Sequence, residues 1–394
     1  MEPADKYQRQ LLEQIHHGQF YGKPPSPATE QAFLDTPRHK FVKRYRAQEW
    51  HEVNAGNLEE HLGAIYADAP LILFADAQGN VLSTIGQPGF ILQMLDLLKL
   101  EPGHRVFELG AGSGWNAALM ARLVGPEGHI YSTEIITKVA KMAVENIQES
   151  GITNVSVIEA DGGEGYPDRA PYDRAIFTAG AYDLPRPFYA QIKEGGLLLI
   201  VLKSEGGGDN LFVLQKTADH FQSTLSMPCG FVEMTGKYQL AALKPIHLET
   251  TADWSELQDR EISRIRFWWG GPRQAPFVWR TSSIRFFLSL TEPSFQSFIQ
   301  ETQDPMQPPE YYFGLWDRQN QSLVLAKDDY LIAYGNSEAK ERLMQAIQHW
   351  VELGMPASSC FELQVYPSDV PLTLHEGEWI VKRNDSQFLW TLQK

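Results

Sequence analysis

Between residues 88 and 202, short apolar runs alternate with segments in which apolar residues recur every three or four positions. The second pattern is typical of amphipathic helices, and it predicts them over residues 90–100, 116–124 and 138–150. The short runs predict strands over residues 106–109, 130–133, 155–160, 174–178 and 197–202. Strands that alternate with helices in this way form right-handed βαβ units around a parallel sheet, so we expect an α/β fold here.

The two flanks of this region have different patterns. Tyr7, Leu11 and Ile15 have helical spacing, and the residues that follow are mixed in character. Beyond about residue 240 aromatic residues crowd together, and the spacing over residues 337–353 predicts an amphipathic helix. A chain of 394 residues also exceeds what one hydrophobic core usually organises. We therefore predict three parts, which are an N-terminal helical segment (1–87), a central α/β domain (88–240) and a C-terminal α+β domain (241–394).

The charge of the chain argues against nucleic acid as a partner. The formal net charge is −15, and a surface of that sign repels phosphate backbones. No apolar run approaches the roughly 18 residues that a membrane span needs. The N-terminus lacks the basic and apolar regions of a secretory signal, and the histidines are scattered. We therefore expect a cytoplasmic protein that binds no nucleic acid, no membrane and no metal.

A glycine-rich turn follows the first predicted strand of the central domain and opens a helix. It reads Glu-Leu-Gly-Ala-Gly-Ser-Gly over residues 108–114. Glycines permit the backbone angles of a tight turn and let a ligand approach the bare backbone closely. The exposed N–H groups at the helix N-terminus then suit a carboxylate or phosphate. The predicted cofactor-binding residues of this turn are Glu108, Gly110, Ala111, Gly112, Ser113 and Gly114.

Carboxylates follow the next two predicted strands. Glu134 ends the second strand, where a carboxylate accepts hydrogen bonds from ribose hydroxyls. Asp161 ends the third strand, where a carboxylate is placed to accept from an adenine amino group. Taken singly, each residue is more often a helix cap or part of a solvated turn. Together with a GxGxG spacing in place of the GxGxxG of dinucleotide-binding folds, they favour S-adenosylmethionine over NAD as the cofactor.

Several segments in one order resemble the protein-L-isoaspartate O-methyltransferases, over roughly residues 28–240. These segments are Gln31–Val42, Tyr66–Leu71, Thr84–Pro88, Pro102–Gly114, Asp161–Gly162, Ala170–Asp173, Thr178–Ala179, Lys193–Gly196 and Phe231–Thr235, which looks like the closing strand. The resemblance implies a Rossmann-like class I methyltransferase fold that binds S-adenosylmethionine and esterifies an Asp or isoAsp carboxylate of a peptide or protein. It also implies that the cofactor contacts Ile135, Gly162, Thr178 and Thr235.

One signature position departs from the family. The family has a serine in a Thr-Ile-Ser-Gln-Pro stretch, beside the cofactor and the acceptor carboxylate, and this chain has Gly86 there. We expect Ser83 and Thr84 to supply the hydroxyl as catalytic residues; the alternative is that they cap a turn. A carboxylate with a pKa of about 4 is already a nucleophile at neutral pH. Alignment, rather than a general base, is therefore expected to drive the reaction.

The C-terminal extension is a second departure, because repair enzymes of the family are little longer than the catalytic domain. Residues 313–317, 348–350 and 353–356 resemble the tail of longer members, which are associated with ribosomally made, modified peptides (RiPPs). The resemblance implies methylation of an aspartate on a pre-shaped precursor, followed by cyclisation of the ester to an aspartimide. The C-terminal domain would then recognise the substrate.

Two other functions stay open at this point. One is an RNA methyltransferase, because a tRNA-modifying family has a similar catalytic domain; the acidic charge and the Thr84–Pro88 segment argue against it. The other is a cofactor-binding module in which methyl transfer has decayed, with Gly86 as the lesion. The aromatic stretch from Phe267 to Trp279 is expected to be core rather than a peptide-binding surface.

Overall fold

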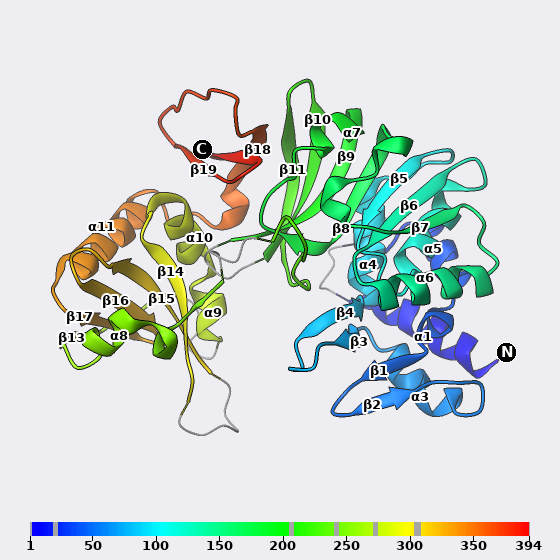
Figure 1. Ribbon diagram of the computed structural model, residues 1–394, viewed down its shortest axis with the longest axis horizontal. Coiled ribbons are helices and arrows are strands. Elements are labelled where there is room, and N and C mark those ends of the chain that lie inside the picture. Colours follow the sequence, from blue (N-terminus) through cyan, green and yellow to red (C-terminus); the bar gives the residue numbers. More distant parts are fainter. Residues whose placement is uncertain are drawn as a thin grey trace. The chain divides into compact units, whose positions relative to one another are not determined.

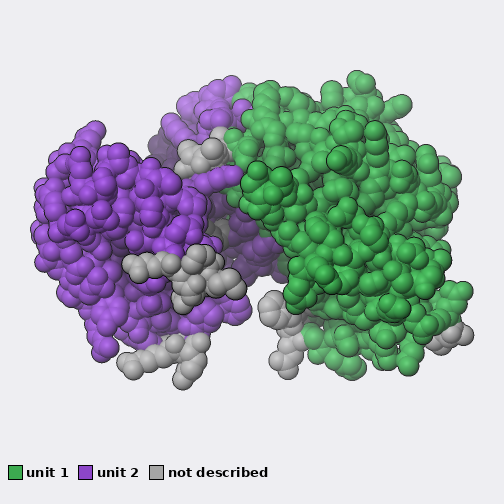
Figure 2. Space-filling view, turned by 60° about the horizontal axis from the view of Figure 1, so that its bottom comes forward, with its two compact units in different colours: residues 1–201, 211–225, 231–239 green, residues 202–210, 226–230, 240–394 purple. Residues whose placement is uncertain are grey.

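The computed structural model describes residues 2–18, 23–204, 209–239, 244–270, 275–302 and 309–393. They form two compact units, coloured separately in Figure 2. Unit 1 comprises residues 1–201, 211–225 and 231–239, and unit 2 comprises residues 202–210, 226–230 and 240–394. The chain thus passes between the units after residues 201, 210, 225, 230 and 239. Because a pattern read along the sequence yields only linear boundaries, the three-part division stays a prediction.

A sheet with parallel central strands forms the middle of unit 1 (Figure 1). β5 pairs in parallel with β6 and β8, and β6 pairs in parallel with β7. Seven strands of this sheet follow the order β11-β10-β9-β8-β5-β6-β7. They are β5 (Arg105–Leu109), β6 (His129–Glu134), β7 (Val155–Glu159), β8 (Tyr172–Ala181), β9 (Ile192–Lys203), β10 (Asp209–Thr217) and β11 (His220–Cys229). The parallel pairing confirms the predicted α/β fold and brings the carboxyl ends of β5 to β8 to one edge.

The helices of the central domain lie where the spacing predicts them. Apolar residues at helical spacing are buried on one side of α6, including Val139, Ala143 and Ile147. Pro88 lies in the first turn of α4, where its missing N–H would have no intrahelical partner. The helical segments of this region are α4 (Pro88–Leu98), α5 (Trp115–Val124), α6 (Thr137–Glu149), η3 (Gly162–Glu164), η4 (Pro167–Arg169) and α7 (Phe188–Gln191).

The N-terminal part of unit 1 contains a four-stranded antiparallel sheet with the order β2-β1-β3-β4. Its strands are three to five residues long, too short for an alternating pattern to stand out in the sequence. The elements are α1 (Pro3–His17), α2 (Pro27–Leu34), η2 (Arg38–Phe41), β1 (Arg44–Arg46), β2 (Trp50–Glu52), α3 (Leu58–Ile65), β3 (Leu71–Ala75) and β4 (Val81–Ile85). β4 carries Ser83 and Thr84.

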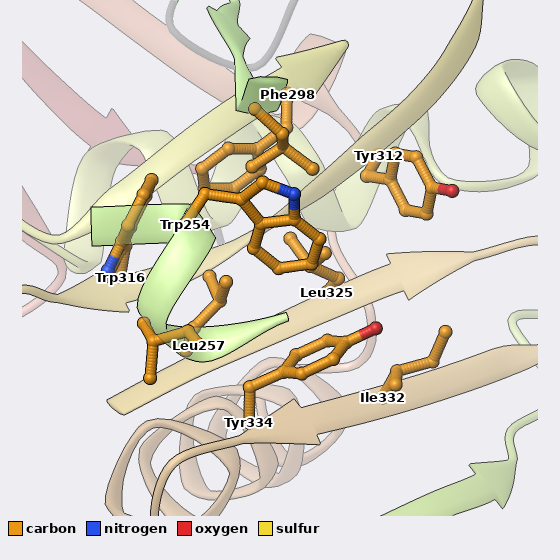
Figure 3. Close-up of a cluster of buried hydrophobic side chains, with 10 residues drawn as sticks. Trp254, Leu257, Phe298, Tyr312, Trp316, Leu325, Ile332 and Tyr334 are labelled. Carbon is orange, nitrogen blue, oxygen red and sulfur yellow. The ribbon is translucent and has the colours of Figure 1, made fainter. Parts of the chain in front are cut away.

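Unit 2 has a sheet with the order β12-β14-β15-β16-β17-β13 and a core of its own. Trp254, Phe298, Trp316 and Tyr334 belong to a buried cluster, which Figure 3 shows. Three further strands pair in the order β19-β20-β18. The elements are β12 (Ile246–His247), η6 (Leu248–Thr250), α8 (Ala252–Leu257), β13 (Glu261–Arg266), α9 (Phe277–Arg280), α10 (Ser282–Thr291), β14 (Phe295–Gln300), β15 (Glu310–Asp317), β16 (Ser322–Lys327), β17 (Tyr330–Tyr334), α11 (Glu338–Glu352), η7 (Ser358–Cys360), β18 (Phe361–Pro367), β19 (Glu378–Lys382) and β20 (Ser386–Leu392).

Two sequence-based expectations are corrected. Residues 231–235, expected as a closing strand, form only an isolated bridge between Glu233 and Gly180. The aromatic stretch, expected as core, divides between core and surface. Trp269 is 6% exposed, whereas Trp268 and Trp279 are 48% and 71% exposed. Composition indicates that aromatic residues gather in this stretch, but which of them are buried depends on the backbone direction at each position.

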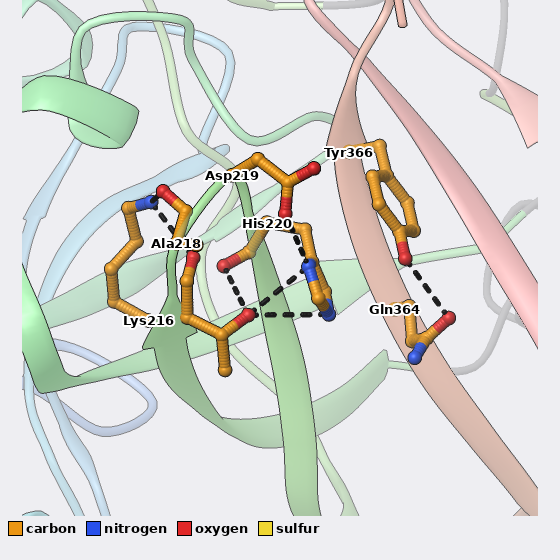
Figure 4. A network of polar contacts seen from close by, with 7 residues as sticks. Lys216, Ala218, Asp219, His220, Gln364 and Tyr366 are labelled. Atoms are coloured by element: carbon orange, nitrogen blue, oxygen red, sulfur yellow. Dashed lines mark hydrogen bonds and ion pairs between the residues drawn. The ribbon is translucent and has the colours of Figure 1, made fainter. Parts of the chain in front are cut away.

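A polar network closes the hairpin between β10 and β11 (Figure 4). Lys216 is buried, and its Nζ donates to the carbonyl oxygens of Thr217 (3.0 Å) and Ala218 (2.8 Å). The Nδ1 atom of His220 lies 2.9 Å from the Oδ1 atom of Asp219, within hydrogen-bond distance. Burial lowers the pKa of Lys216. Carbonyl groups of the turn itself accept hydrogen bonds from this ammonium group. The network therefore stabilises the hairpin.

Among the described residues, no helix combines the length and the apolar character that crossing a membrane requires. The same residues contain no group of three or more His, Cys, Asp or Glu side chains arranged to hold a metal ion.

Candidate active site

A cavity in unit 1 opens at the carboxyl ends of the parallel strands. Its empty volume is about 910 Å³, including space open to solvent. The lining comes from residues 82–86, 109–113, 115–116, 133–136, 161–162, 178–179 and 231–235, together with Ile91. The predicted site residues that line it are Ser83, Thr84, Gly110, Ala111, Gly112, Ser113, Glu134, Ile135, Asp161, Gly162, Thr178 and Thr235.

The glycine-rich turn after β5 takes backbone angles that favour glycine. Gly110, Gly112 and Gly114 have φ values of 92°, 55° and 83°. Thr178 on β8 fixes the start of the turn, because its Oγ1 donates to the carbonyl oxygens of Leu109 (2.9 Å) and Gly110 (2.7 Å). A Cβ atom at Gly110 would lie 2.5 Å from that same Oγ1. The close approach of Thr178 therefore requires glycine at position 110.

Glu134 at the end of β6 ties two strand ends together. Its Oε2 accepts a hydrogen bond from the Gly112 N–H, and its Oε1 accepts one from the Ile136 N–H, both at 3.1 Å. The residue is only 7% exposed, and burial raises the pKa of its carboxyl group. Each oxygen keeps a further lone pair for a ligand hydroxyl. Glu134 is therefore placed to accept hydrogen bonds from within the cavity.

Asp161, after β7, also accepts two backbone hydrogen bonds, one of them from the segment at residues 235–237. Its Oδ1 accepts from the Gly163 N–H and its Oδ2 from the Lys237 N–H, both at 2.9 Å. A Cβ atom at Gly236 would lie 2.4 Å from Oδ2, so only glycine lets this segment come so close. These contacts hold residues 235–237 beside the cavity that Thr235 lines. Asp161 thus supports the cavity wall as well as facing the cavity.

Two predicted residues, Glu108 and Gly114, do not line the cavity. Glu108 is fully buried, and its carboxylate accepts hydrogen bonds from Ser132 Oγ (2.5 Å) and Asn116 Nδ2 (2.7 Å). Burial raises the pKa of Glu108 to about 7, and the nearby charge of Glu134 also raises it. The hydrogen bonds from Ser132 and Asn116 lower the pKa and so limit the shift. Asn116, which the sequence reasoning missed, does line the cavity, and its Oδ1 has no hydrogen-bond partner among the described residues.

Ser83 and Thr84 approach the glycine-rich turn from β4. A Cβ atom at Gly112 would lie 3.8 Å from Ser83 Oγ and 3.5 Å from the Thr84 carbonyl oxygen. Ser83 is buried, at 6% exposure. The predicted catalytic pair and the predicted cofactor-binding turn therefore face each other, and a Cβ atom at position 112 would make ordinary van der Waals contacts with β4.

Arg38 holds the β4 side of the cavity, and the sequence reasoning did not assign it a role at the site. Its guanidinium is fully buried, and burial lowers its pKa to about 9, so it stays charged at neutral pH. The group donates to the carbonyl oxygens of Ile85 (3.2 Å) and Gly86 (2.9 Å), directly after Thr84. Its remaining acceptors are the carbonyl oxygens of Ile65, Ala67 and Ala69.

A comparison with models of known protein families shows which family the chain belongs to. The sequence profile of "Protein-L-isoaspartate(D-aspartate) O-methyltransferase (PCMT)" matches residues 8–239. The chain belongs to this family. A protein-L-isoaspartate O-methyltransferase of Ignicoccus hospitalis is 38% identical over 204 residues, which are 52% of this chain and 87% of that protein. The corresponding protein of Methanothrix thermoacetophila is 41% identical over 180 residues, which are 46% of this chain and 81% of that protein.

A solved structure titled protein-L-isoaspartate O-methyltransferase shares the fold over most of the chain. The match has a TM-score of 0.55 at 22% identity and covers 91% of this chain and 96% of that one. The PCMT profile ends at residue 239, where unit 2 resumes. Family membership makes the chain a protein carboxyl O-methyltransferase that uses S-adenosylmethionine.

The residues of the cavity fit this cofactor. The turn at 110–114 gives bare backbone for close approach, because Cβ atoms are absent where they would meet Thr178 and β4. Glu134 and Asp161 offer buried or half-buried carboxylate oxygens at two further strand ends. Which of these atoms contact which part of the cofactor stays a prediction.

Proposed function

We propose that the acceptor is an Asp or isoAsp carboxylate of a pre-shaped peptide, such as a ribosomal natural-product precursor, and that the methyl ester goes on to an aspartimide. In this proposal the backbone N–H that follows the ester attacks its carbonyl carbon, and methanol leaves as the imide ring closes. Unit 2 is proposed to recognise the peptide. The proposal extends the family activity, protein carboxyl O-methylation, to a particular class of substrate.

The observation that carries the proposal is the packing around Gly86. A Cβ atom at position 86 would lie 2.8 Å from Ile91 Cδ1 and 3.0 Å from Ile91 Cγ1. Ile91 lines the cavity, so an apolar side chain fills the space next to the position where the resemblance places a serine. A donor to a flexible isoaspartyl carboxylate is therefore missing at this point. A substrate whose own shape positions its carboxylate needs such a donor less, because a constrained peptide loses little conformational entropy when it binds.

In this site the bound cofactor supplies an activated methyl group on a positively charged sulfur. The turn at 110–114, Glu134 and Asp161 would bind and orient it. Ser83 Oγ, on the β4 wall, donates to the acceptor carboxylate and so fixes its direction. Arg38 keeps β4 in place through the carbonyls of residues 85 and 86. Removal of water from the carboxylate by the enclosing walls raises its reactivity, and no side chain has to take up a proton.

The test offers S-adenosylmethionine with a labelled methyl group to two peptides of equal length. One is a linear peptide with an isoaspartyl residue, and the other is a macrocyclic peptide with a single Asp in a constrained ring. We expect base-labile label on the macrocycle, and mass spectrometry should then find a product lighter by the mass of water than the starting peptide, as aspartimide formation requires.

Label on the linear peptide alone would refute the specialised substrate and leave ordinary isoaspartyl repair. Label on neither peptide, combined with cofactor binding measured by calorimetry, would favour a module that binds the cofactor without transferring the methyl group. An active relative that lacks the C-terminal extension serves as the positive control for the linear peptide.

A further inference from the structure

Unit 2 has an open strand edge to which the proposed function has so far assigned no role. β13 is the last strand in the order β12-β14-β15-β16-β17-β13, so among the described strands only β17 pairs with it. Every residue of β13 is exposed except Ser263, which is half-buried. Ile262 and Ile265 are 48% and 36% exposed. An exposed edge with apolar side chains is a template for pairing with another chain.

The backbone of β13 presents two residues to this open edge. The Phe267 N–H donates to the Asp329 carbonyl oxygen at 2.9 Å, so Phe267 faces the neighbouring strand segment. In an antiparallel pair, alternate residues direct both N–H and C=O to the same neighbour. Ile265 therefore also faces β17, which it pairs with at Leu331. Arg264 and Arg266 lie on either side of Ile265 and alternate with these positions, so their N–H and C=O groups point to the open side.

The charge around this edge is opposite to that of the whole chain. β13 itself carries two arginines, Arg264 and Arg266, and one acidic residue, Glu261, whereas the chain has a net charge of −15. Arg264 is paired with Glu261 at 2.7 Å, but half of its side chain is exposed. Arg266 lies 5.9 Å from the Tyr330 ring, and its Nε approaches the Tyr330 hydroxyl at 3.4 Å, with no ion pair among the described residues. The edge is thus locally basic.

An exposed aromatic residue continues the surface beyond β13. Trp268 is 48% exposed, and the Arg280 guanidinium lies 5.5 Å from its ring centre. Arg280 is fixed by Asp329, with 2.9 Å between Nη1 and Oδ1. Protecting an edge against aggregation explains charged side chains on β13. It does not explain exposed isoleucines together with an exposed tryptophan, which are typical of a binding surface.

We propose that the open edge of β13 takes up an extended acidic segment of the substrate peptide as an added strand. The identity of this peptide rests on the proposed function. Backbone groups of Arg264 and Arg266 pair with the added strand, and their guanidinium groups, which share one face, meet carboxylates on alternate residues of the segment. The residue between those carboxylates faces the same side as Ile265 and is apolar. The recognised pattern is therefore acidic, apolar, acidic.

The test measures binding of a fluorescent peptide that carries this alternating pattern to the full-length chain, by fluorescence anisotropy. We expect Arg264→Gln with Arg266→Gln to weaken binding at least about tenfold, because both guanidinium contacts are lost. The matched control is Arg318→Gln with Arg342→Gln. It removes the same charge from ion pairs with Asp253 and Glu292 elsewhere in unit 2, and it should leave binding unchanged.

A second pair of peptides tests for strand addition itself. In an added strand, only every second residue directs its N–H group to β13. One peptide has these backbone nitrogens methylated and so lacks the donors that face β13. The other peptide is methylated on the alternate residues and keeps them. We expect one register to abolish binding and the other to preserve it. Equal effects of both registers, or unchanged affinity of the Arg264→Gln, Arg266→Gln variant, would overturn the proposal. Because binding is read without methyl transfer, inactivity towards every peptide would refute the proposed function and leave this result standing.

Discussion

At the scale of single residues, a buried carboxyl group directly before the glycine-rich turn has a raised pKa. Glu108 is fully buried, and burial raises its pKa to about 7. Ser132 and Asn116 donate hydrogen bonds to the ionised form, which limits the shift, while the charge of Glu134 adds to it. The structure therefore accommodates the neutral acid more easily than the carboxylate.

Replacing Glu108 by Gln should remove a pH dependence of stability. The pKa of Glu108 is higher in the folded state, so its protonated form favours folding. This contribution is complete below about pH 4.5 and disappears as the pH rises through about 7, and its full size is on the order of 3 kcal/mol. Urea unfolding of both proteins between about pH 5 and 8 should show wild type losing stability relative to Glu108→Gln. Parallel curves would contradict the assignment.

Asp161 offers a second residue-scale prediction. Asp161→Ala removes both acceptor oxygens and also releases the 235–237 segment, so we expect S-adenosylmethionine affinity to fall at least about tenfold, or about 1.4 kcal/mol. Isothermal titration calorimetry gives the dissociation constants. Lys237→Ala is the control, because only the backbone N–H of Lys237 contacts Asp161 while its side chain pairs with Glu164. Unchanged affinity in Asp161→Ala would remove this residue from cofactor binding.

The Gly86 position gives a prediction about substrate range. Gly86→Ser alone places its Cβ within 3.0 Å of Ile91, so we expect a less stable protein with little gain in activity. In the double variant Gly86→Ser, Ile91→Ala, the space exists, and methylation of a linear isoaspartyl peptide should rise relative to wild type. Ile91→Ala alone is the control for the cavity. Equal activities of the double variant and the Ile91→Ala control would show that the serine hydroxyl is not what limits this substrate.

At the scale of elements, regular spacing of apolar residues decides which helices and strands can be predicted from the sequence. The central helices and strands were predictable because each carries several apolar residues at regular spacing, as on α6. The strands β1 to β4 were not, because three to five residues cannot establish an alternation. The glycine-rich turn, Glu134 and Asp161 were predictable because parallel strands place their carboxyl ends together. Arg38 was not, because its acceptors lie 27 to 48 residues away in sequence.

Arg38 also gives the prediction for this scale, since it joins η2 to β4. Arg38→Lys keeps the charge but replaces a planar fork by a compact ammonium, leaving several buried carbonyls without donors. Each loss costs about 1–3 kcal/mol, so we expect a clear drop in the free energy of unfolding. At a temperature where the variant is folded, KM for the peptide should rise more than the cofactor dissociation constant. Arg44→Lys, on β1, is the control, because the Arg44 guanidinium lies 3.8 Å from the Glu52 carboxylate and not against β4, and it should change neither value.

At the scale of the whole molecule, each unit buries a core of its own although the chain passes between them repeatedly. β5 and β8 bury Phe107 and Phe177 in unit 1, and Phe298 belongs to the buried cluster of unit 2. Every residue that lines the cavity belongs to unit 1. A ligand that binds only the folded form of a unit stabilises that unit. It changes the stability of the other unit only if the unfolding of the two units is coupled.

Calorimetric unfolding should therefore separate the two units when the reaction product S-adenosylhomocysteine is added. At a free concentration of about 100 times its dissociation constant, the ligand stabilises the form that binds it by about 2.7 kcal/mol. We expect one transition to move to higher temperature and a second to stay in place. Phe298→Ala, which leaves a cavity in the core of unit 2, should lower the free energy of unfolding of the second transition by about 3–5 kcal/mol. The ligand-induced shift of the first transition should not change. A single transition that responds equally to ligand and to Phe298→Ala would mean that the units unfold as one, and recognition of a peptide by unit 2 would then be coupled to the stability of the cofactor site.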